Sequence, residues 1–575
     1  MADKSDSLPA IIVGHGLAGL VAAYELTQRG VPVVIVDQET RANLGGQAFF
    51  SLGGLFLVNS KAQRARGIKD SHALAMRDWL GTAKFDRLDT QDRWPLMWAK
   101  AFVQFAAEEF EQYVTNLGLS FIQVGWAERG DGTAGGHGNS VPRFHLSWGT
   151  GPEVVRIFLE PVLAAEKRGL VTFMHRRMVD RLMTDSSGRV VGIAGRVLKE
   201  DEEVARGKPT TRESTGSFEL RGATVLVASG GIGGNVEAVK KAWPLDRLGP
   251  KVPQSFVIGV PAHVDGRMME IAEEAGAHMV NQDRMWHYTE GLQNWDPIWP
   301  DHGIRVLPAP SSLWLDARGK RLPPFLYPGS DTLATLKHIC ATGYDYSWFI
   351  LDRSILAREF ALSGSEQNPD ITNKSYWQAL LQRVLTKKGT DAVQAFCEHG
   401  VDFVVRETLP DLVAGMNELA SAVGGPALDL ADITETVEAR DSQMDNLYSK
   451  DAQAMLIHNS RLYWYDKISR VTPPHRLQDP KHGPLIAVRM HLLTRKTLGG
   501  IETDLGSRVQ RADGSSFPGL YAAGEAAGFG GGGVHGYAAL EGTFLGGCIF
   551  SGRAAGRAMA NEILGANPTR RDSHL

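Results

Sequence analysis

Residues 10–38 carry the pattern that most constrains the fold: a short apolar run, a GxGxxG turn, a helix-like stretch and a second β-branched run. Gly14 allows the tight turn, Gly16 lets backbone N–H groups approach a pyrophosphate, and Gly19 lets the helix pack closely on the strand. The N-terminus of that helix attracts the same anion. Asp37 closes the second run, where a carboxylate accepts ribose hydroxyls. Because an acid there disfavours a 2′-phosphate, the pattern predicts FAD or NAD rather than NADP.

The composition narrows the class of protein further. The chain has 575 residues and 43% hydrophobic content, more than one core usually organises, so we expect two or more domains. Its net charge of −4 argues against a nucleic-acid binder and against a binder of anionic membranes. The three cysteines form no CxxC motif, which argues against a disulfide framework, a zinc knuckle or an attached haem. We therefore expect no metal site and a reducing compartment.

The chain ends bear on location. The N-terminal stretch MADKSDSLPA is polar and acidic, unlike a secretion signal, and the apolar runs are too short to span a bilayer. Ser573-His574-Leu575 loosely resembles a peroxisomal tripeptide, but the sequence favours a polar tail. These features predict a cytoplasmic protein without a transmembrane segment.

Other glycine-rich stretches indicate backbone held against a flat ligand, since only glycine leaves room for so close an approach. The Gly-Gly pairs of NLGGQ and SLGGL follow the opening unit, and a buried strand at residues 224–228 runs into SGGIGGN. Near the C-terminus, GLYAAGE can present Glu525 to polyol hydroxyls. The glycine run that follows places N–H groups at a helix N-terminus.

The middle of the chain differs in character from both ends. Residues 286–481 hold seven of the thirteen tryptophans and many prolines, and the last hundred residues return to a glycine-rich α/β style. We therefore expect a first segment at residues 1–285, an inserted domain at 286–481 and a returning segment at 482–575. The tryptophans predict either an apolar pocket for a flat substrate or ordinary core packing.

Taken in order, the motifs GxGxxG, TVLVASGGIGGN, VDGRMMEIAEEAGA, TLGGIETD, GLYAAGEAAG and GRAAG resemble a superfamily of FAD-binding flavoproteins. It contains the flavoprotein subunits of fumarate reductase and succinate dehydrogenase and the 3-ketosteroid dehydrogenases. The resemblance implies an α/β fold with a Rossmann-like FAD-binding domain of the glutathione-reductase type and an inserted α+β cap domain. It also implies that FAD is held non-covalently, because Gln47 and Ala48 stand where the covalent members place a histidine.

The resemblance assigns the ADP half of FAD to the opening unit, the flavin to the Gly-Gly pairs and the ribitol side to Glu525. The helix after Gly533 would then stabilise the reduced flavin. The candidate cofactor-binding residues are Gly14, Gly16, Leu17, Ala18, Gly19, Asp37, Gln38, Gly45, Gly46, Gln47, Ser51, Gly53, Gly54, Ala228, Ser229, Gly230, Gly524, Glu525 and Gly533.

Departures from the fumarate reductase pattern help to choose a subfamily. Lys496 and Ala539 occupy the positions of the histidine and the arginine that clamp a dicarboxylate, which argues against that substrate. The sequence TLGG is closer to the ketosteroid dehydrogenases. In those enzymes a tyrosine before the glycine run helps to polarise the substrate carbonyl, together with a backbone N–H of the run. This chain has Phe529 in place of the tyrosine, so only the Gly533 N–H remains as a donor.

The resemblance implies dehydrogenation of a CH–CH bond beside a carbonyl, with hydride passing to flavin N5 and a base removing the α-proton. The candidate catalytic residues are Tyr327, as the counterpart of the cap tyrosine, with His535, Tyr537 and Gly533. Tyr288 and His287 are further candidates for base or donor.

Three functions remain open at this point. One is the dehydrogenation of a hydrophobic carbonyl compound such as a ketosteroid, with an external electron acceptor. The second is the reverse reaction, the reduction of an activated C=C bond, and the third is a flavin-binding protein without turnover of its own.

Overall fold

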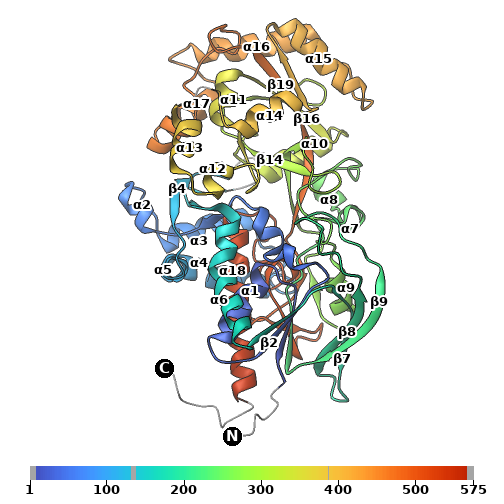
Figure 1. Ribbon diagram of the computed structural model, residues 1–575. Helices are drawn as coiled ribbons and strands as arrows, with labels where there is room; N and C mark the ends of the chain where they lie inside the picture. Colours follow the sequence, from blue (N-terminus) through green and yellow to red (C-terminus); the bar gives the residue numbers. More distant parts are fainter. Residues whose placement is uncertain (1–7, 131–136, 386–387, 566–575) are drawn as a thin grey trace.

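The computed structural model describes residues 8–130, 137–385 and 388–565, so the tripeptide Ser573-His574-Leu575 lies outside the described residues. A lower part is built on a parallel sheet and an upper part on a mixed sheet (Figure 1). Strands alternate with helices through both parts, which confirms the expected α/β class.

The parallel sheet has the strand order β21-β22-β10-β1-β2-β6, and its neighbours are parallel except for the pair β21 and β22. Strands β1 and β10 are buried along their whole length, as expected for central strands covered on both faces. The strands are β1 (Ala10–Val13), β2 (Val33–Val36), β6 (Val171–Met174), β10 (Thr224–Val227), β21 (Arg508–Gln510) and β22 (Ser516–Ala522).

Three long helices lie beside this sheet: α1 (Leu17–Thr27), α6 (Thr150–Lys167) and α18 (Thr543–Gly565) (Figure 1). Helix α18 packs directly on α1. Glycines make this approach possible, since a Cβ on Gly552 would lie 2.5 Å from the carbonyl oxygen of Ala18. The last helix is thereby fixed against the first strand–helix unit, although more than 500 residues separate them in sequence.

The predicted strand–turn–helix–strand unit at residues 10–38 is confirmed. Gly14 has φ +109°, and a Cβ there would lie 2.4 Å from the carbonyl oxygen of Ala228. A Cβ on Gly19 would lie 2.1 Å from the carbonyl oxygen of Gly14. Both glycines are therefore required sterically, one by the turn and one by helix–strand packing.

Smaller elements surround the parallel sheet. One antiparallel sheet consists of β7 (Arg177–Thr184), β8 (Val190–Leu198) and β9 (Ser214–Arg221). A second consists of β3 (Gly54–Phe56), β5 (Phe144–Ser147) and β4 (Phe121–Gly125). A short strand pair is formed by β12 (Met279–Val280) and β20 (Gly500–Ile501). The helices of this part are α2 (Lys61–Ala65), α3 (His72–Ala83), α4 (Arg93–Glu108), α5 (Phe110–Asn116) and α9 (Arg267–Glu274), with short 3₁₀ turns η1 (Arg41–Asn43), η2 (Gly46–Phe50) and η5 (Gly524–Ala526). Helices α7 (Val236–Lys241) and α8 (Leu245–Leu248) contribute buried residues to the core of the upper part.

The mixed sheet of the upper part has the order β15-β16-β19-β13-β14-β17, and β11 and β18 also pair with β19. Its strands are β11 (Val257–Ile258), β13 (Met285–Gln293), β14 (Gly303–Leu307), β15 (Leu313–Asp316), β16 (Tyr346–Asp352), β17 (Ala361–Leu362), β18 (Phe403–Arg406) and β19 (Leu485–Thr497). Around it lie α10 (Thr332–Ala341), α11 (Arg353–Glu359), α12 (Pro369–Thr372), α13 (Tyr376–Leu380), α14 (Asp391–His399), α15 (Leu409–Ser421), α16 (Leu430–Met444) and α17 (Ala452–Ser460), with the π-helical turns η3 (Leu381–Leu385) and η4 (Asp466–Arg470).

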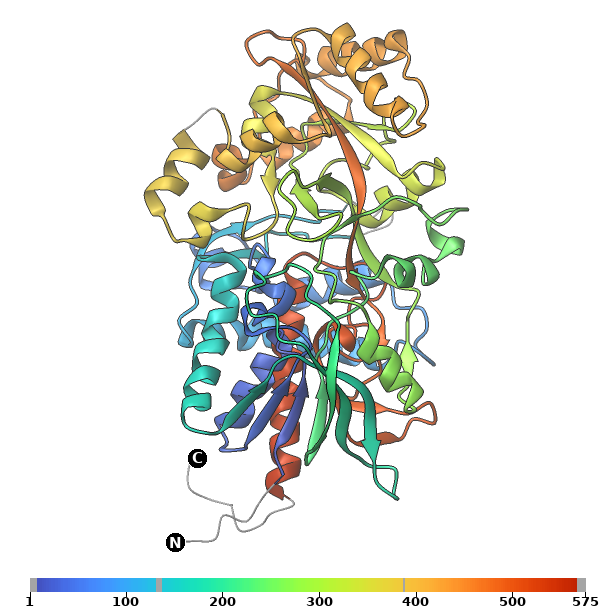
Figure 2. The same cartoon turned by 45° about the vertical axis from the view of Figure 1, so that its right-hand side comes forward.

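Strand β19 joins the two parts. It pairs with β13, β16 and β18 in the upper part and runs down toward the parallel sheet (Figure 2). The expected segment boundaries at residues 285 and 481 lie next to β13 and β19, and both strands belong to the mixed sheet. The mixed sheet thus takes a central strand from the returning segment.

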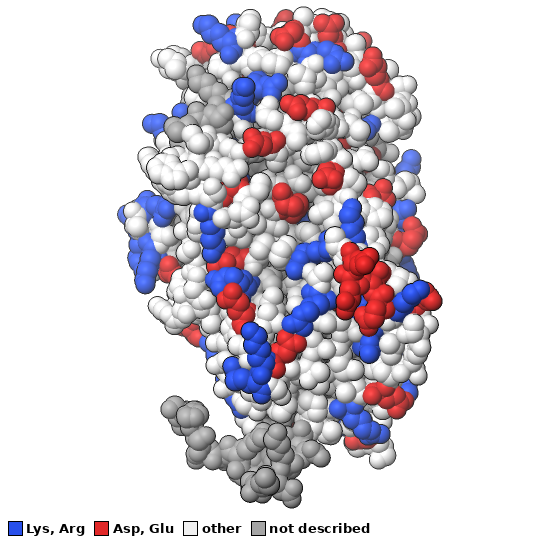
Figure 3. Space-filling view, viewed as in Figure 1, with Lys and Arg blue, Asp and Glu red and all other residues white. Residues whose placement is uncertain are grey.

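The surface shows no dominant charge on the face that Figure 3 presents, where basic and acidic side chains are interspersed. Among the described residues, no helix is long and apolar enough to cross a membrane.

Candidate active site

A cavity runs from the carboxyl ends of the parallel strands to the mixed sheet, and we call it the main cavity. Gly14, Asp37 and Ala228 lie at its lower end, directly after β1, β2 and β10. Tyr288 of β13 and Arg305 of β14 lie in its upper wall. Ligands of open α/β sheets bind at this edge of the strands, so the cavity is the candidate site.

Most of the cofactor-binding candidates lie together in the wall of the main cavity. Those in the wall are Gly14, Gly16, Leu17, Ala18, Asp37, Gly45, Gly46, Gln47, Ser51, Gly53, Gly54, Ala228, Ser229, Gly230, Gly524 and Glu525. The wall formed by the described residues does not include Gly19, Gln38 or Gly533. Gly19 supports the turn from behind, and Gln38 lines a separate small pocket.

The lower end of the cavity is suited to an anion. Helix α1 begins after Gly16 with no side-chain cap and no acidic residue in its first turn. Its first N–H groups are therefore available to a ligand. A Cβ on Gly16 would have only the carbonyl oxygen of Ala228, 3.9 Å away, within 4 Å, so the space beside this glycine is open. Any side chain at this position would occupy the place of a phosphate.

Asp37 is held at the rim of the same end. Its Oδ2 accepts a hydrogen bond from the N–H of His15 at 2.9 Å, and its Oδ1 accepts one from the N–H of Glu39 at 2.8 Å. Burial alone would raise the pKa of Asp37, but nearby His15 and these two N–H groups lower it, so the carboxylate is ionised. A fixed, ionised carboxylate can accept the hydroxyls of a ribose.

A polar triangle lies further along the wall. Glu525 Oε2 accepts a hydrogen bond from Gln47 Nε2 at 2.5 Å, and Lys496 Nζ donates to Gln47 Oε1 at 2.6 Å. Glu525 Oε1 also accepts from the N–H of Thr497 at 2.9 Å. Burial lowers the pKa of Lys496, and the carboxylate of Glu525 opposes this shift. The triangle orients a carboxylate and a buried amine toward one ligand.

At the upper end, Tyr288, Arg305 and Glu541 form what we call the cavity cluster, and all three line the cavity. Arg305 Nη1 lies 2.5 Å from Glu541 Oε1, and the Tyr288 hydroxyl donates to the same oxygen at 3.2 Å. The Arg305 guanidinium covers the Tyr288 ring, with its carbon 3.5 Å from the ring centre. Each side chain is less than a tenth exposed.

Two more buried carboxyl groups surround Arg305. Glu128 Oε1 lies 3.5 Å from Arg305 Nη2 and accepts a hydrogen bond from Thr332 Oγ1 at 2.5 Å. Burial and the neighbouring Glu541 raise the pKa of Glu128 to about 8. Burial also raises the pKa of Glu290, whose Oε2 has no hydrogen-bond partner in the described residues. One guanidinium thus faces three carboxyl groups, which favours retention of protons among them.

Known proteins can now be compared with this geometry. A family model described as an FAD binding domain matches residues 10–545. The chain belongs to this FAD-binding family. It is 58% identical over 555 residues to a KsdD-like steroid dehydrogenase of Mycobacterium tuberculosis, and the match covers 96% of each chain. A KsdD-like steroid dehydrogenase of Mycolicibacterium smegmatis is 60% identical, over 96% of this chain and 99% of the relative.

Solved structures share the fold. The chain superposes on 3-ketosteroid Δ1-dehydrogenase of Sterolibacterium denitrificans with a TM-score of 0.66 and 16% identity, covering 97% of this chain and all of that one. A flavocytochrome c3 fumarate reductase gives a TM-score of 0.63 and 19% identity, covering 98% of this chain and 80% of that one. The Rossmann-like FAD-binding fold and the membership of the flavoprotein superfamily that the sequence predicts are therefore confirmed, and the chain is an FAD-dependent oxidoreductase.

The main cavity of this FAD-binding protein fits its cofactor on three observations. The open space beside Gly16 faces an uncapped helix N-terminus, as a pyrophosphate requires. Both ring nitrogens of His15 are buried and have no hydrogen-bond partner among the described residues, and Nδ1 lies 3.3 Å from Asp37 Oδ2 without hydrogen-bond geometry. Glu525 presents a carboxylate for ribitol hydroxyls. Gly14, Gly16 and Asp37 would hold the ADP half, with Gln47 and Glu525 nearer the flavin.

All four candidate catalytic positions lie outside the described lining of the main cavity. His535 is buried against the Trp79 ring, with centroids 5.5 Å apart, and its Nε2 lies 2.9 Å from Thr543 Oγ1. Burial lowers the pKa of His535 to about 3, so the ring is neutral. The Gly533 N–H donates to the carbonyl oxygen of Gly530 at 3.2 Å, within the glycine turn. Tyr327 is buried in the upper part and lines neither this cavity nor the second one described below.

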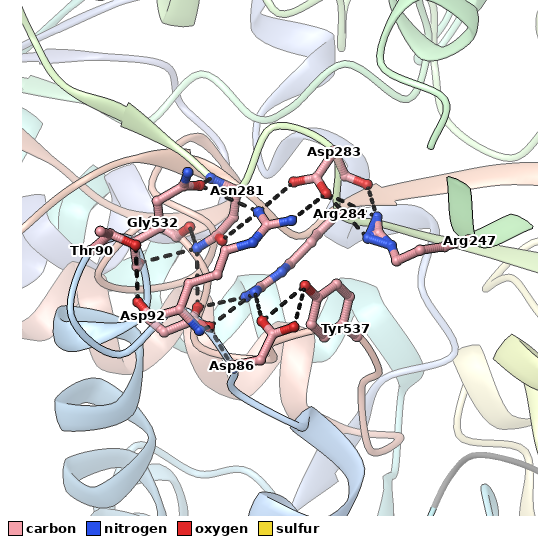
Figure 4. A network of polar contacts seen from close by, with 11 residues as sticks. Asp86, Thr90, Asp92, Arg247, Asn281, Asp283, Arg284, Gly532 and Tyr537 are labelled. Atoms are coloured by element: carbon pink, nitrogen blue, oxygen red, sulfur yellow. Dashed lines mark hydrogen bonds and ion pairs between the residues drawn. The ribbon is translucent and has the colours of Figure 1, made fainter. Parts of the chain in front are cut away.

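The fourth position, Tyr537, belongs to a separate network that we call the clasp cluster: Asp86, Asp92, Arg284 and Tyr537 (Figure 4). The Tyr537 hydroxyl donates to Asp86 Oδ1 at 2.9 Å, and the Arg284 guanidinium covers its ring at 3.9 Å. Arg284 also binds both carboxylate oxygens of Asp92, at 2.6 and 2.9 Å. This network ties the α3–α4 connection to the start of β13 and does not line the main cavity.

The sequence did not single out Arg305 or Glu541. Arg305 sits in the apolar strand GIRVL and Glu541 interrupts the apolar stretch YAALEG, and a charge within such a stretch is the signal that could have drawn attention to them. Trp286, Trp299, Trp314 and Trp348 are buried in the packing, and no tryptophan lines the part of the main cavity that the structure describes. For these four, core packing is the interpretation that holds.

Proposed function

We propose that the chain dehydrogenates a CH–CH bond beside the carbonyl of a bulky hydrophobic ketone, of the 3-ketosteroid class. The observation that carries the proposal is the position of the cavity cluster, an acid–base group in the wall of the same cavity that fits FAD. The names of the relatives that are 58–60% identical support the substrate class. When bound, FAD supplies the acceptor for the hydride of the β-carbon.

The proposal assigns proton removal to Glu541. Its Oε1 accepts both the Tyr288 and the Arg305 hydrogen bonds, and none of the described residues donates to Oε2. That oxygen is therefore free to accept the acidic proton next to a carbonyl. The guanidinium of Arg305 stabilises the carboxylate and fixes its direction. This assignment replaces the candidates Tyr327, His535, Tyr537 and Gly533.

Tyr288 supports the carboxylate as a hydrogen-bond donor. Burial raises the pKa of Tyr288 well above its usual range, and the nearby carboxylate of Glu541 raises it further. The phenol thus keeps its proton at neutral pH and donates a hydrogen bond to Glu541. Loss of the hydroxyl would remove one of the two hydrogen bonds that Oε1 of Glu541 accepts.

Positive charge for the developing enolate oxygen comes from Arg495 and Lys496, which also line the cavity. Burial lowers the pKa of Arg495, as it does that of Lys496. Both groups are preorganised, because Arg495 donates to the carbonyl oxygen of Gly259 and Lys496 to Gln47. Donors held in place before the charge develops are the effective kind.

The remaining expectations belong to the same proposal. FAD is held without a covalent bond, an external acceptor reoxidises it, the location is cytoplasmic, and nucleic acid is not a partner. Release of the yellow chromophore on acid precipitation tests the first of these, since a covalent flavin stays with the pellet.

An anaerobic absorbance titration of the FAD-loaded protein tests the reaction. Addition of a saturated 3-ketosteroid is expected to bleach the flavin band, and the 1,2-dehydro product is expected to perturb it without bleaching. A cyclohexanone of similar carbonyl chemistry but small size serves as the matched control. A fully loaded flavin that no ketosteroid bleaches or perturbs would contradict the proposal.

A further inference from the structure

A second cavity adjoins the main cavity. Leu52, Phe144, Arg305 and Leu307 line both cavities, so the two spaces share a wall. A ligand held at the cavity cluster can therefore extend past Leu307 into the second cavity. The second cavity lies among β4, α12, α13 and η4, at the junction of the lower and upper parts (Figure 1).

The wall of the second cavity is largely apolar near the junction. Pro308, Phe360, Ala361 and Ile371 contribute aliphatic and aromatic surface. Such a wall fits the hydrophobic body of a ligand, because removal of apolar surface from water is favourable. The charged groups of the wall then decide what the far end of the ligand carries.

Two arginines in this wall already have carboxylate partners. Arg129 pairs with Asp466, and Arg383 binds both oxygens of Asp370, with Nε 2.6 Å from Oδ2 and Nη2 2.8 Å from Oδ1. Their charges are compensated within the protein. They form part of the packing of the cavity wall and leave little charge for a ligand.

Arg358 and Arg470 differ, because neither has a carboxylate partner among the described residues. Arg358 Nη2, at the end of α11, donates to the carbonyl oxygen of Ile468 in η4 at 3.1 Å. Arg470, in η4, donates in return to the carbonyl oxygen of Glu359 at 3.4 Å and to that of Leu307 at 2.8 Å. Each guanidinium has five N–H donors, so most of them remain for a ligand.

The surroundings show the effect of this unbalanced charge. Burial lowers the pKa of Arg129, and Arg470 lowers it further, against the effect of Asp466. Burial likewise lowers the pKa of Arg461, and Arg358 adds to that shift. Arg470 thus lies within electrostatic reach of Arg129, and Arg358 of Arg461, while Asp466 and Glu359 act in the opposite direction. An anion bound to Arg358 and Arg470 would add to this compensation.

We propose that the second cavity holds the end of the substrate away from the reacting ketone, and that Arg358 and Arg470 bind a carboxylate there. The forked guanidinium matches a carboxylate with two parallel hydrogen bonds. Arg470 donates to the carbonyl oxygen of Leu307 in β14. Leu307 lies two residues after Arg305, so their backbones are roughly 7 Å apart in an extended strand. The substrate is thus a hydrophobic ketone with an acidic side chain, and this inference rests on the proposed function.

The test compares one ketosteroid carrying a carboxylic acid side chain with its methyl ester. The FAD-loaded wild type and the variants Arg358→Gln, Arg470→Gln and Arg461→Gln are titrated with both compounds, and calorimetry gives Kd for the corresponding 1,2-dehydro products. Arg461 is the matched control, because it also donates to backbone carbonyl oxygens, those of Val471 and Lys467, yet does not line the cavity.

The wild type is expected to favour the acid over the ester by about tenfold or more in Kd and in kcat/KM, as for a hydrogen bond to a charged group. Arg358→Gln and Arg470→Gln each reduce this preference, whereas Arg461→Gln keeps it. Equal affinity of the wild type for acid and ester, or an equal loss in Arg461→Gln, would overturn the inference and leave the proposed function intact. Absence of binding and of flavin bleaching with both compounds would overturn both.

Discussion

Two clusters in this protein are built from the same groups in the same arrangement. In the cavity cluster, Arg305 covers the ring of Tyr288, and the hydroxyl of that ring donates to Glu541. In the clasp cluster, Arg284 covers the ring of Tyr537, and the hydroxyl donates to Asp86. Local geometry alone therefore does not tell a catalytic tyrosine from a structural one.

Charge balance separates the two. Around the clasp cluster the ion pairs join Arg87, Arg247 and Arg284 to Asp86, Asp92 and Asp283. In the cavity cluster one guanidinium, Arg305, faces Glu541, Glu128 and Glu290. Burial and the neighbouring Glu541 raise the pKa of Glu128 to about 8, and burial raises the pKa of Glu290, shifts of the kind that acid–base chemistry requires.

Access to a ligand separates them as well. The cavity cluster lines the main cavity and the clasp cluster does not. An oxidoreductase can use an acid–base group only where a substrate reaches it. The comparison therefore assigns chemistry to the first cluster and the joining of two parts of the chain to the second.

The largest expected effect is on activity in the cavity cluster. Glu541→Gln keeps the shape of the side chain but removes the proton acceptor, so kcat is expected to fall by about 10² to 10⁴. The matched change in the clasp cluster, Asp86→Asn, is expected to leave kcat within about threefold. Steady-state rates with FAD content measured by absorbance check both. Comparable losses in the two variants would remove the distinction.

The next effect is on stability in the clasp cluster. Asp92→Asn removes the buried carboxylate partner of the fully buried Arg284 and leaves it only the exposed Asp86, at a cost of about 3–5 kcal/mol. Burial would raise the pKa of Asp92, but the hydrogen bonds of Arg284 lower it. Its stabilisation is therefore present above about pH 4 and is lost as the pH falls below that value. Thermal midpoints at pH 7 and about pH 3 should differ less in the variant than in the wild type, and an unchanged difference would contradict this account.

Glu128 gives the cavity cluster the opposite pH dependence. Its pKa of about 8 in the folded protein exceeds the ordinary value near 4, so the folded state retains a proton that the unfolded state has released. The free energy of unfolding therefore falls as the pH rises from about 4 to 8. Relative to the wild type, Glu128→Gln is expected to have a more favourable effect on the thermal midpoint at pH 8 than at pH 5. The exposed control Glu160→Gln should leave that difference unchanged, and the same result for both variants would count against a raised pKa.

The smallest effect is expected at the edge of the clasp cluster. Arg247 pairs with Asp283 at 3.1 Å, and both side chains are about one quarter to one third exposed. Partly exposed pairs contribute about 0–1 kcal/mol, so Arg247→Gln is expected to change the thermal midpoint little and kcat not at all. A shift as large as that of Asp92→Asn would mean that the pair, and not the buried Arg284, holds the network together.

The sequence predicted the parts of the fold that local pattern specifies. Gly14, Gly19 and Asp37 occupy the positions that the opening motif requires, and the run at 224–228 forms β10 beside β1. These assignments succeed because a tight turn, a close helix contact and a buried parallel strand each need particular residue types at short spacing.

The catalytic assignments required the tertiary structure. Tyr288 and Arg305 meet because β13 pairs with β14, and Glu541 reaches them from a turn more than 200 residues away in sequence. Tyr537 follows the glycine run, which drew attention to it. In the structure the Tyr537 hydroxyl instead donates to Asp86. Short-range motifs indicate where a cofactor would bind, but the groups that we propose to act on the substrate are brought together from distant parts of the chain.

The most direct test of the central claim is the rate of flavin reduction in Tyr288→Phe and Tyr537→Phe, measured by anaerobic stopped-flow absorbance with a saturated 3-ketosteroid. Loss of a hydrogen bond to a charged group costs about 1.5–3 kcal/mol, so Tyr288→Phe is expected to slow reduction by roughly 10- to 150-fold. Tyr537→Phe is expected to reduce the flavin at the wild-type rate. A slow Tyr537→Phe together with an unaffected Tyr288→Phe would show that the chemistry lies outside the cavity cluster.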